Sequence, residues 1–330
     1  MDFLSQLKHD RDVGNISDSI YEIFYNLHQS YVTALTRAKV DYSKHVLVFD
    51  TYLKLVKKQI ATPYQFEPFH KKITTPFNYD EFGFELFRPM VDEENSTLRH
   101  PENVEKMSRQ LNAKENVILF ANHQTEVDPK IIYLILEKKF ADLGSNMIFV
   151  AGDRVITDPI AVPVSLGCNL LCIYSKRHIN NPPEKKEEKL IYNQKTMKRM
   201  KQLLAEGGKA IYVAPSGGRD RRNDKGVITL SPFDPQSVEM FRLMAKQARS
   251  ITHFYPLALK TYDILPPPNT VMSDLGEARL TSRVPIHFSF GDEIDTEHFP
   301  GDTLKDRHAR RAALSMYVFN LVKTLYTELP

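Results

Sequence analysis

The chain lacks any long apolar run. None of its 330 residues lie in a stretch that approaches the roughly 18 consecutive apolar residues of a membrane-spanning helix. One of the most apolar windows, residues 162–174, is interrupted by Pro163, Gly167 and Asn169. The sequence therefore predicts a protein with no transmembrane segment, for which peripheral contact is the closest association with a membrane.

Cysteine is scarce, with only Cys168 and Cys172. If both lie in one strand, their four-residue spacing puts them on the same face but about 13 Å apart. That separation is too large for a disulfide, and two thiols are too few for a zinc site. We expect both to be buried thiols of a protein from a reducing compartment, and we expect no metal.

A strong excess of charge is also missing, because 44 Lys and Arg face 41 Asp and Glu, for a net charge of +3. This excess is too small to indicate nucleic-acid binding, although basic residues can still cluster locally. The first ten residues are too polar for a secretory signal and too acidic for a transit peptide. We therefore expect a cytoplasmic protein, or one whose leader has been removed.

The N-terminal region has the apolar spacing of helices. Apolar residues recur at helical intervals around residues 3–7, 20–31 and 46–60, and these three segments predict a small helical bundle. An irregular connector rich in proline and aromatic residues follows. We place a domain boundary near residue 75, which gives a bundle domain of residues 1–75 and a second domain of residues 76–330.

Strands and helices alternate in the second region. The predicted strands are residues 117–120, 147–151, 170–174, 210–213, 254–259 and 286–290. The predicted helices between and after them are residues 130–138, 183–206, 235–248 and 303–325. Such alternation indicates an α/β fold with a mixed, mostly parallel sheet flanked by helices. His287, inside the last strand, is expected to be a satisfied strand residue.

A polar loop follows the buried strand 117–120 and contains His123 and Asp128. Asp128 and Pro129 are typical of an N-cap and a first-turn proline. On a helix, residues five apart point roughly 140° away from each other, so His123 and Asp128 can meet only through a loop. A carboxylate that holds one imidazole nitrogen leaves the other free to take a proton from a hydroxyl. The alternative is that Asp128 only caps a helix and His123 only closes a turn.

Three further polar loops follow strands of the same predicted sheet, at residues 152–154, 175–178 and 214–222. Because the carboxyl ends of parallel strands share one edge, these loops should gather near His123. Arg219 and Arg221 follow two glycines, which let the backbone approach an anion while each guanidinium grips two oxygens. The alternative for this basic turn is a solvated surface loop. Together the loops predict a phosphate site.

These motifs, in this order, resemble the soluble plastid-type glycerol-3-phosphate 1-acyltransferases, which also occur in some intracellular bacteria. The resemblance runs from about residue 64 to residue 268. It rests on Asn-His-Gln-Thr-Glu with Asp-Pro at 122–129, Phe-Val-Ala-Gly-Asp-Arg-Val at 149–155, Tyr-Ser-Lys with His at 174–178, Ala-Pro-Ser-Gly-Gly-Arg-Asp-Arg at 214–221 and Pro-Leu-Ala-Leu at 256–259.

The resemblance implies that His123 and Asp128 form the catalytic pair. It also implies that the substrate phosphate is bound by Lys176, Arg177, His178, Arg219 and Arg221. The chain departs from the family at one point, because the family's Ser-Lys-Lys-His is Ser-Lys-Arg-His here. Arginine differs from lysine in reach and geometry, so the division of roles between Lys176 and Arg177 stays open.

The implied reaction moves a fatty acyl group from acyl-carrier protein or acyl-CoA to the 1-hydroxyl of sn-glycerol 3-phosphate, without a metal or a prosthetic group. The resemblance also makes the plastid stroma the alternative to the cytoplasm as the location of the protein. One rival function is acylation of the 2-hydroxyl of lysophosphatidate. Another is a non-catalytic module that binds phospholipid headgroups. The lysine-rich segment 184–201 is either a solvated helix face or a dock for an acidic carrier protein.

Overall fold

An eight-stranded sheet forms the centre of the structure, a computed structural model that describes residues 2–176, 178–268 and 277–330. The strand order across the sheet is β1-β5-β4-β6-β3-β9-β10-β2. The strands are β1 (Phe69–His70), β2 (Thr97–Arg99), β3 (Asn116–Ala121), β4 (Ile148–Gly152), β5 (Asn169–Ile173), β6 (Ala210–Val213), β9 (Thr252–Lys260) and β10 (His287–Phe290). A separate two-stranded sheet pairs β7 (Arg221–Arg222) with β8 (Ile228–Thr229).

Most neighbouring strands are parallel. β5, β4, β6, β3 and β9 all run in the same direction, and β2 is parallel to β10. Only β1 against β5 and β10 against β9 are antiparallel in this sheet, among the residues described. The predicted α/β fold with a mixed, mostly parallel sheet is therefore confirmed. The sequence did not predict β1 and β2, because two or three residues are too short to carry a periodic pattern.

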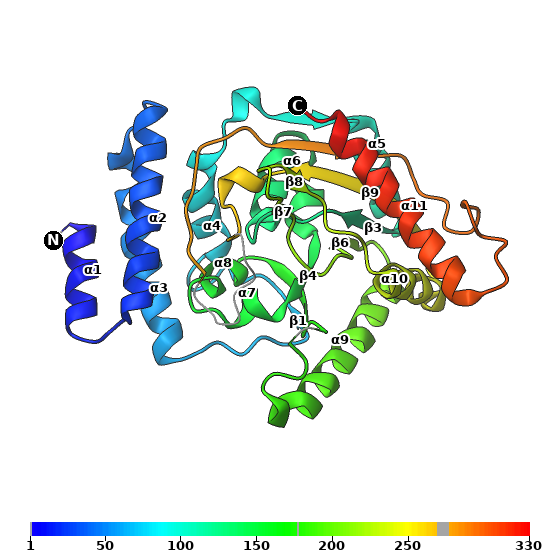
Figure 1. Cartoon of the computed structure of the whole chain (residues 1–330), viewed down its shortest axis with the longest axis horizontal. Coiled ribbons are helices and arrows are strands. Elements are labelled where there is room, and N and C mark those ends of the chain that lie inside the picture. Colours follow the sequence, from blue (N-terminus) through cyan, green and yellow to red (C-terminus); the bar gives the residue numbers. More distant parts are fainter. Residues whose placement is uncertain (1, 177, 269–276) are drawn as a thin grey trace.

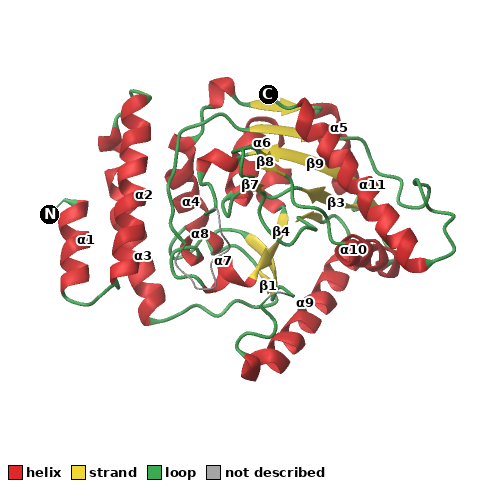
Figure 2. Cartoon of the chain, viewed as in Figure 1, coloured by secondary structure: helices red, strands yellow, loops and turns green. Residues whose placement is uncertain are grey.

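Helices cover both faces of the sheet (Figures 1 and 2). Side chains alternate along β3, so Ile118 and Phe120 pack toward one helical layer while Val117 and Leu119 pack toward the other. The first layer consists of α9 (Lys186–Glu206), α10 (Pro235–Ala248) and α11 (Arg307–Glu328). The second contains α4 (Tyr79–Phe87), α5 (Pro101–Asn112) and α6 (Asp128–Asn146).

The three predicted N-terminal helices are present and lie side by side at one end of the molecule (Figure 1). They are α1 (Phe3–Asp12), α2 (Asp18–Arg37) and α3 (Val46–Ala61). The Tyr52 hydroxyl of α3 donates to the Ile160 carbonyl at 2.7 Å, beside the short helices α7 (Asp153–Thr157) and α8 (Val162–Ser165). One hydrophobic cluster continues from Phe3 to Phe290. The division into domains at residue 75 stays a prediction.

Several local expectations are corrected. Cys168 lies just before β5 rather than within it, although both cysteines are buried free thiols as expected. His287 lies in β10, but its Nδ1 is buried without a hydrogen-bond partner, so the expectation of a satisfied side chain was wrong. α6 reaches Asn146, but its backbone is non-helical at Phe140, so its first regular stretch ends close to the predicted end at residue 138. Within the described part of the chain, no helix is long and apolar enough to cross a membrane.

Candidate active site

His123 and Asp128 meet at the carboxyl end of β3. The chain leaves the buried strand at Ala121 and turns through a six-residue loop before α6 begins at Asp128. His123 Nδ1 lies 2.8 Å from Asp128 Oδ2, and the aspartate side chain is fully buried while the histidine side chain is 27% exposed. This contact occupies one ring nitrogen of His123, so the Nε2 edge is the one available to a bound molecule.

Asp128 supports the loop rather than the helix. Its Oδ2 accepts the backbone N–H groups of Gln124 at 2.9 Å and Thr125 at 3.3 Å, and its Oδ1 accepts the Thr261 hydroxyl at 2.6 Å. The N-cap position belongs to Val127, so the expected N-cap role of Asp128 was wrong by one residue. The side chain turns back because the loop amides and His123 offer it donors. These contacts fix the carboxylate that holds the imidazole.

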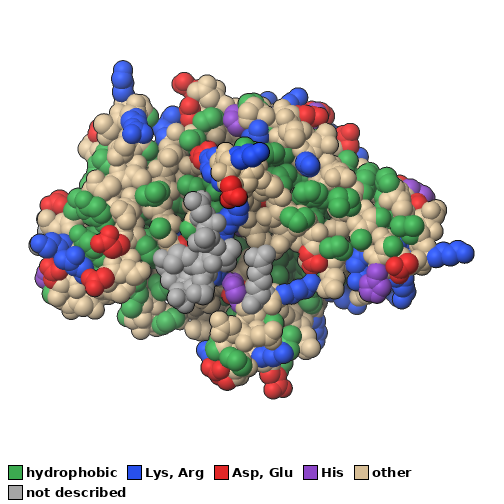
Figure 3. All heavy atoms as spheres, in the orientation of Figure 1, with side chains coloured by type: hydrophobic (Ala, Val, Ile, Leu, Met, Phe, Trp, Pro, Cys, Tyr) green, Lys and Arg blue, Asp and Glu red, His purple; other side chains and the backbone are tan. Residues whose placement is uncertain are grey.

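A cationic cavity opens beside His123. Arg154, His178, Arg219, Arg221 and Arg279 line it, and the first four of these follow parallel strands, in the polar loops that the sequence placed there. It contains about 1170 Å³ of space and is open to solvent. In the space-filling view, a His side chain and several Lys or Arg side chains are visible near the middle of the molecule's face (Figure 3). The cavity therefore offers arginine and histidine donors, and enough space, to a small anionic ligand, although Glu126, Asp153, Asp158 and Glu277 also line it.

Acidic side chains hold these cations in place. The Glu277 carboxylate pairs with both Arg219 and Arg154, the latter at 2.9 Å, and Asp153 Oδ2 lies 2.8 Å from His178 Nδ1. Arg279 is buried and pairs with Glu126 at 2.6 Å and Asp158 at 2.9 Å. Burial alone would lower the pKa of Arg279, but these two carboxylates raise it well above its ordinary value. Arg279 therefore stays charged and links the His123 loop to α7.

The structure does not bring all the predicted phosphate ligands together. His178, Arg219 and Arg221 line the cationic cavity. Lys176 does not, because its Nζ lies 2.9 Å from Asp234 and 2.7 Å from Gln236 and its side chain is 71% exposed. Arg177 lies outside the described residues. We therefore leave Lys176 out of the candidate phosphate site.

Sequence reasoning missed Glu277 and Arg279 as members of the site, and it placed the loop of Arg154 there without giving that residue a role. Arg154 had a usable signal, because it belongs to a polar loop directly after a predicted strand. Glu277 and Arg279 follow no predicted strand or helix, and only the packing of the folded chain brings them to the cavity. Across the described residues, no group of three or more His, Cys, Asp or Glu side chains is placed to hold a metal ion.

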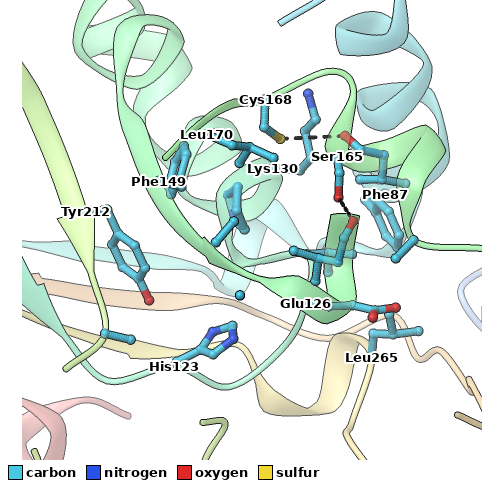
Figure 4. Close-up of a pocket in the computed structure, with 18 of the residues that line it drawn as sticks. Phe87, His123, Glu126, Lys130, Phe149, Ser165, Cys168, Leu170, Tyr212 and Leu265 are labelled. Carbon is cyan, nitrogen blue, oxygen red and sulfur yellow. Dashed lines mark hydrogen bonds between the residues drawn. The ribbon is translucent and has the colours of Figure 1, made fainter. Parts of the chain in front are cut away.

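A second cavity adjoins the first, shares His123 with it and is mainly apolar (Figure 4). The space between its lining residues, including a part that is open to solvent, is about 880 Å³. Its wall includes side chains of β4, β5 and α8, together with Leu27 and Tyr52 from the N-terminal helices. Figure 4 shows His123 at one end of the cavity and Cys168 at the opposite end. This shape suits an extended apolar group whose reactive end lies beside the imidazole.

The polar side chains in this apolar wall are satisfied by the protein. The Ser165 hydroxyl donates to the Val155 carbonyl at 2.6 Å, and the Cys168 thiol lies 3.6 Å from the Val164 carbonyl. Lys130 directs its Nζ to Asp80 at 2.5 Å and to the Gly167 carbonyl at 2.6 Å. Because these three side chains already have partners in the protein, an apolar ligand beside them leaves none of them without a hydrogen bond.

His123 lies at the junction of the two cavities, since it lines both of them. In comparison with known proteins, residues 96–260 match the Acyltransferase family. The chloroplastic glycerol-3-phosphate acyltransferase of Spinacia oleracea is 34% identical over 331 residues, which cover 99% of this chain and 70% of that protein. The protein of the same name from Arabidopsis thaliana is 35% identical over 319 residues, which cover 94% of this chain and 68% of that protein.

The chain belongs to the glycerol-3-phosphate acyltransferase family. The resemblance drawn from the motifs is thus confirmed, and this family member is an acyltransferase. Among solved structures, the 1-acyl-sn-glycerophosphate acyltransferase of Thermotoga maritima aligns over 98% of this chain and 95% of its own, with 14% identity and a TM-score of 0.41. The named plant relatives are chloroplastic proteins. The cytoplasmic location of this acyltransferase stays a prediction.

Proposed function

We propose that the protein transfers a fatty acyl group from a thioester to the 1-hydroxyl of sn-glycerol 3-phosphate. The observation that carries the proposal is the place of His123 between a cationic and an apolar cavity. A phosphorylated acceptor fits the first cavity and an acyl chain fits the second. The hydroxyl and the thioester carbonyl then meet at the imidazole.

The phosphate group binds through charge-assisted hydrogen bonds from the cationic cavity. We assign this role to His178, Arg219 and Arg221, with Arg154 beside them. Guanidinium groups suit a phosphate because each can donate two parallel hydrogen bonds to its oxygens. With the phosphate fixed there, the glycerol chain extends toward His123 and presents its hydroxyl to the ring.

His123 acts as the general base in this proposal. Its Nε2 takes the proton of the hydroxyl, and the alkoxide oxygen attacks the thioester carbonyl carbon of the donor. The tetrahedral intermediate then collapses, the carbon–sulfur bond breaks, and the imidazolium returns the proton to the leaving thiolate. Asp128 holds Nδ1 and stabilises the imidazolium. No acyl-enzyme is required, because both substrates are bound together and proximity supplies much of the rate.

Acceptor choice tests this function. Purified protein should acylate sn-glycerol 3-phosphate with either acyl-CoA or acyl-carrier protein, and it should acylate glycerol poorly because glycerol has no phosphate. Faster turnover with micellar lysophosphatidate would favour the 2-acyltransferase. Binding to anionic vesicles without turnover of any acceptor would favour the headgroup-binding module.

The apolar cavity should set which acyl chains react. Cys168 lies at the end away from His123, so Cys168→Met should shorten the cavity. We expect the longest acyl-CoA donors to lose several-fold in kcat/KM while short donors react normally. Overpacking of a core costs about 1–3 kcal/mol of stability, so a matched control is needed. Cys172→Met changes a buried thiol that does not line the cavity, and it should leave the chain-length profile unchanged. An unchanged profile in Cys168→Met would remove this cavity from the donor site.

We also propose that an acidic acyl-carrier protein docks on α9, which extends away from the rest of the molecule (Figure 1). Its lysines at 195, 198 and 201 are exposed, and so are Leu190 and Ile191 near its beginning. A basic surface with a few apolar side chains complements an acidic helical partner. Charge attraction of this kind mainly accelerates association, and it fades as the salt concentration rises.

Reversing Lys195, Lys198 and Lys201 to Glu should weaken use of the carrier-bound donor several-fold or more at low salt. Acyl-CoA, a small donor held by the pocket, should be used almost as before. The control reverses three exposed lysines of α1 and α3, Lys8, Lys54 and Lys58, which gives the same change in net charge. Equal losses with both donors, or equal effects of the two triple variants, would mean that α9 is only a solvated face.

A further inference from the structure

A buried carboxylate connects the two loops of the proposed site. Asp220 is completely buried although it lies between Arg219 and Arg221, whose side chains line the cationic cavity. Its backbone N–H donates to the His123 carbonyl at 2.6 Å. The chain therefore turns so that the two arginines face the cavity while the aspartate between them faces the loop that carries His123.

The Asp220 side chain accepts hydrogen bonds from both sequence neighbours of His123, Asn122 and Gln124. Its Oδ2 accepts the Asn122 amide at 2.9 Å and the Gln124 amide at 3.3 Å, while its Oδ1 accepts the Ser231 backbone N–H at 2.9 Å. All three partners are donors. An asparagine at position 220 would have the same shape, but its NH₂ group would face at least one of these donors.

The neighbours of His123 are otherwise anchored to β9 and to the segment just after it. Asn122 exchanges two hydrogen bonds with Leu259, at 2.9 and 3.0 Å, and Gln124 accepts the Thr261 N–H at 2.8 Å. The Gln124 amide also lies 3.2 Å from the Tyr326 hydroxyl of α11. Asp220 is thus the point where this anchored loop is tied to the basic turn. Burial raises the pKa of its carboxyl to about 6, and the donated hydrogen bonds oppose that shift.

We propose that Asp220 is a positioning residue that fixes the base loop and the phosphate-binding turn relative to each other. The inference rests on the proposed function, because it assigns catalysis to one loop and phosphate binding to the other. His123 influences the chemical step, and Arg219 and Arg221 influence acceptor binding. Loss of their common support should therefore change kcat and the KM for sn-glycerol 3-phosphate together, although Asp220 touches neither substrate.

The decisive variant is Asp220→Asn. We expect kcat to fall and the acceptor KM to rise, each on the order of 10- to 100-fold, because a displacement of about 1 Å is costly at a reacting centre. The KM for the acyl donor should change little. In a His123→Ala background, Asp220→Asn should have almost no further effect on kcat, because no base is left to misplace, but it should still raise the acceptor KM.

Asp10→Asn is the matched control. Asp10 is a buried carboxylate in α1 that accepts Gln6, Asn15 and Lys57, remote from both cavities. It should lower the melting temperature without changing kcat or KM. If the wild-type protein and Asp10→Asn do not acylate sn-glycerol 3-phosphate at all, the proposed function has failed. If they do, Asp220 is tested independently.

Two results would overturn the coupling role of Asp220. One is that Asp220→Asn melts at a lower temperature but keeps kcat and KM within two-fold. The other is that it lowers kcat equally with and without His123. If Asp220→Asn does not fold, Gln124→Met carries the test, because it removes the side-chain amide that donates to Asp220 from the loop of His123. It should lower kcat and raise the acceptor KM together, each by less than Asp220→Asn would, and an unchanged kcat and KM would overturn the proposal.

Discussion

His123→Ala should lose nearly all turnover while it still binds sn-glycerol 3-phosphate. A general base contributes on the order of 10² to 10⁴ in rate, so kcat should fall by that factor. Acceptor affinity should stay close to that of the wild-type protein, because we assign the phosphate contacts to other side chains of the cavity. Steady-state kinetics measure the first effect, and titration calorimetry with the acceptor alone measures the second.

His253→Ala provides the matched control for this prediction. His253 is also paired with carboxylates, those of Glu115 and Glu293, but it lies outside both cavities. Its replacement should leave kcat unchanged. Asp128→Asn should be slow as well, since its amide would disturb the contact with His123 Nδ1 and the loop amides. More than a third of wild-type activity in His123→Ala would end the general-base assignment.

Arg219→Ala and Arg221→Ala should each raise the KM for sn-glycerol 3-phosphate. A hydrogen bond to a charged group is worth about 1.5 to 3 kcal/mol, which corresponds to roughly a 10- to 150-fold change. In Arg219→Ala, the Glu277 carboxylate keeps only one of its two arginine partners, Arg154. Its negative charge is then less well neutralised and repels the phosphate more strongly. The KM for the acyl donor should change little, since we place the acyl chain in the other cavity.

Arg222→Ala is the control that distinguishes the loss of a phosphate contact from a general loss of positive charge. Arg222 is exposed and pairs with Asp263 outside the cavity, so Arg222→Ala should leave the acceptor KM unchanged. Initial rates at varied acceptor concentration measure all three variants. If Arg219→Ala and Arg221→Ala bind the acceptor normally and differ only in thermal stability, the basic turn is structural.

Local patterns in the sequence predicted the central strand and its loops. The run from Val117 to Phe120 is apolar on both faces because helices cover both sides of β3, and such a strand has a strong signature. The place of the polar loops then follows from parallel pairing, which brings the carboxyl ends of β3, β4, β5 and β6 to one edge. For this reason His123, His178, Arg219 and Arg221 were found together.

These local patterns could not predict contacts between segments that are distant in the sequence. Lys176 follows the same strand as His178, but its flexible side chain turns outward to Asp234 in another segment. Glu277 and Arg279 reach the cavity through the packing of an irregular segment that has no periodic signal. The apolar cavity also depends on Leu27 and Tyr52, because helices distant in sequence supply part of its wall. No local pattern specifies such a surface.

The position of the new ester bond tests the central claim most directly. Purified protein is incubated with sn-glycerol 3-phosphate and an acyl thioester, and the acyl position in the product is determined for the wild-type protein and for His123→Ala. We predict 1-acyl-sn-glycerol 3-phosphate from the wild-type protein, with one free thiol released per ester formed, and at least a 100-fold slower reaction from the variant. No ester above the uncatalysed background, or the same rate from both proteins, would contradict the account.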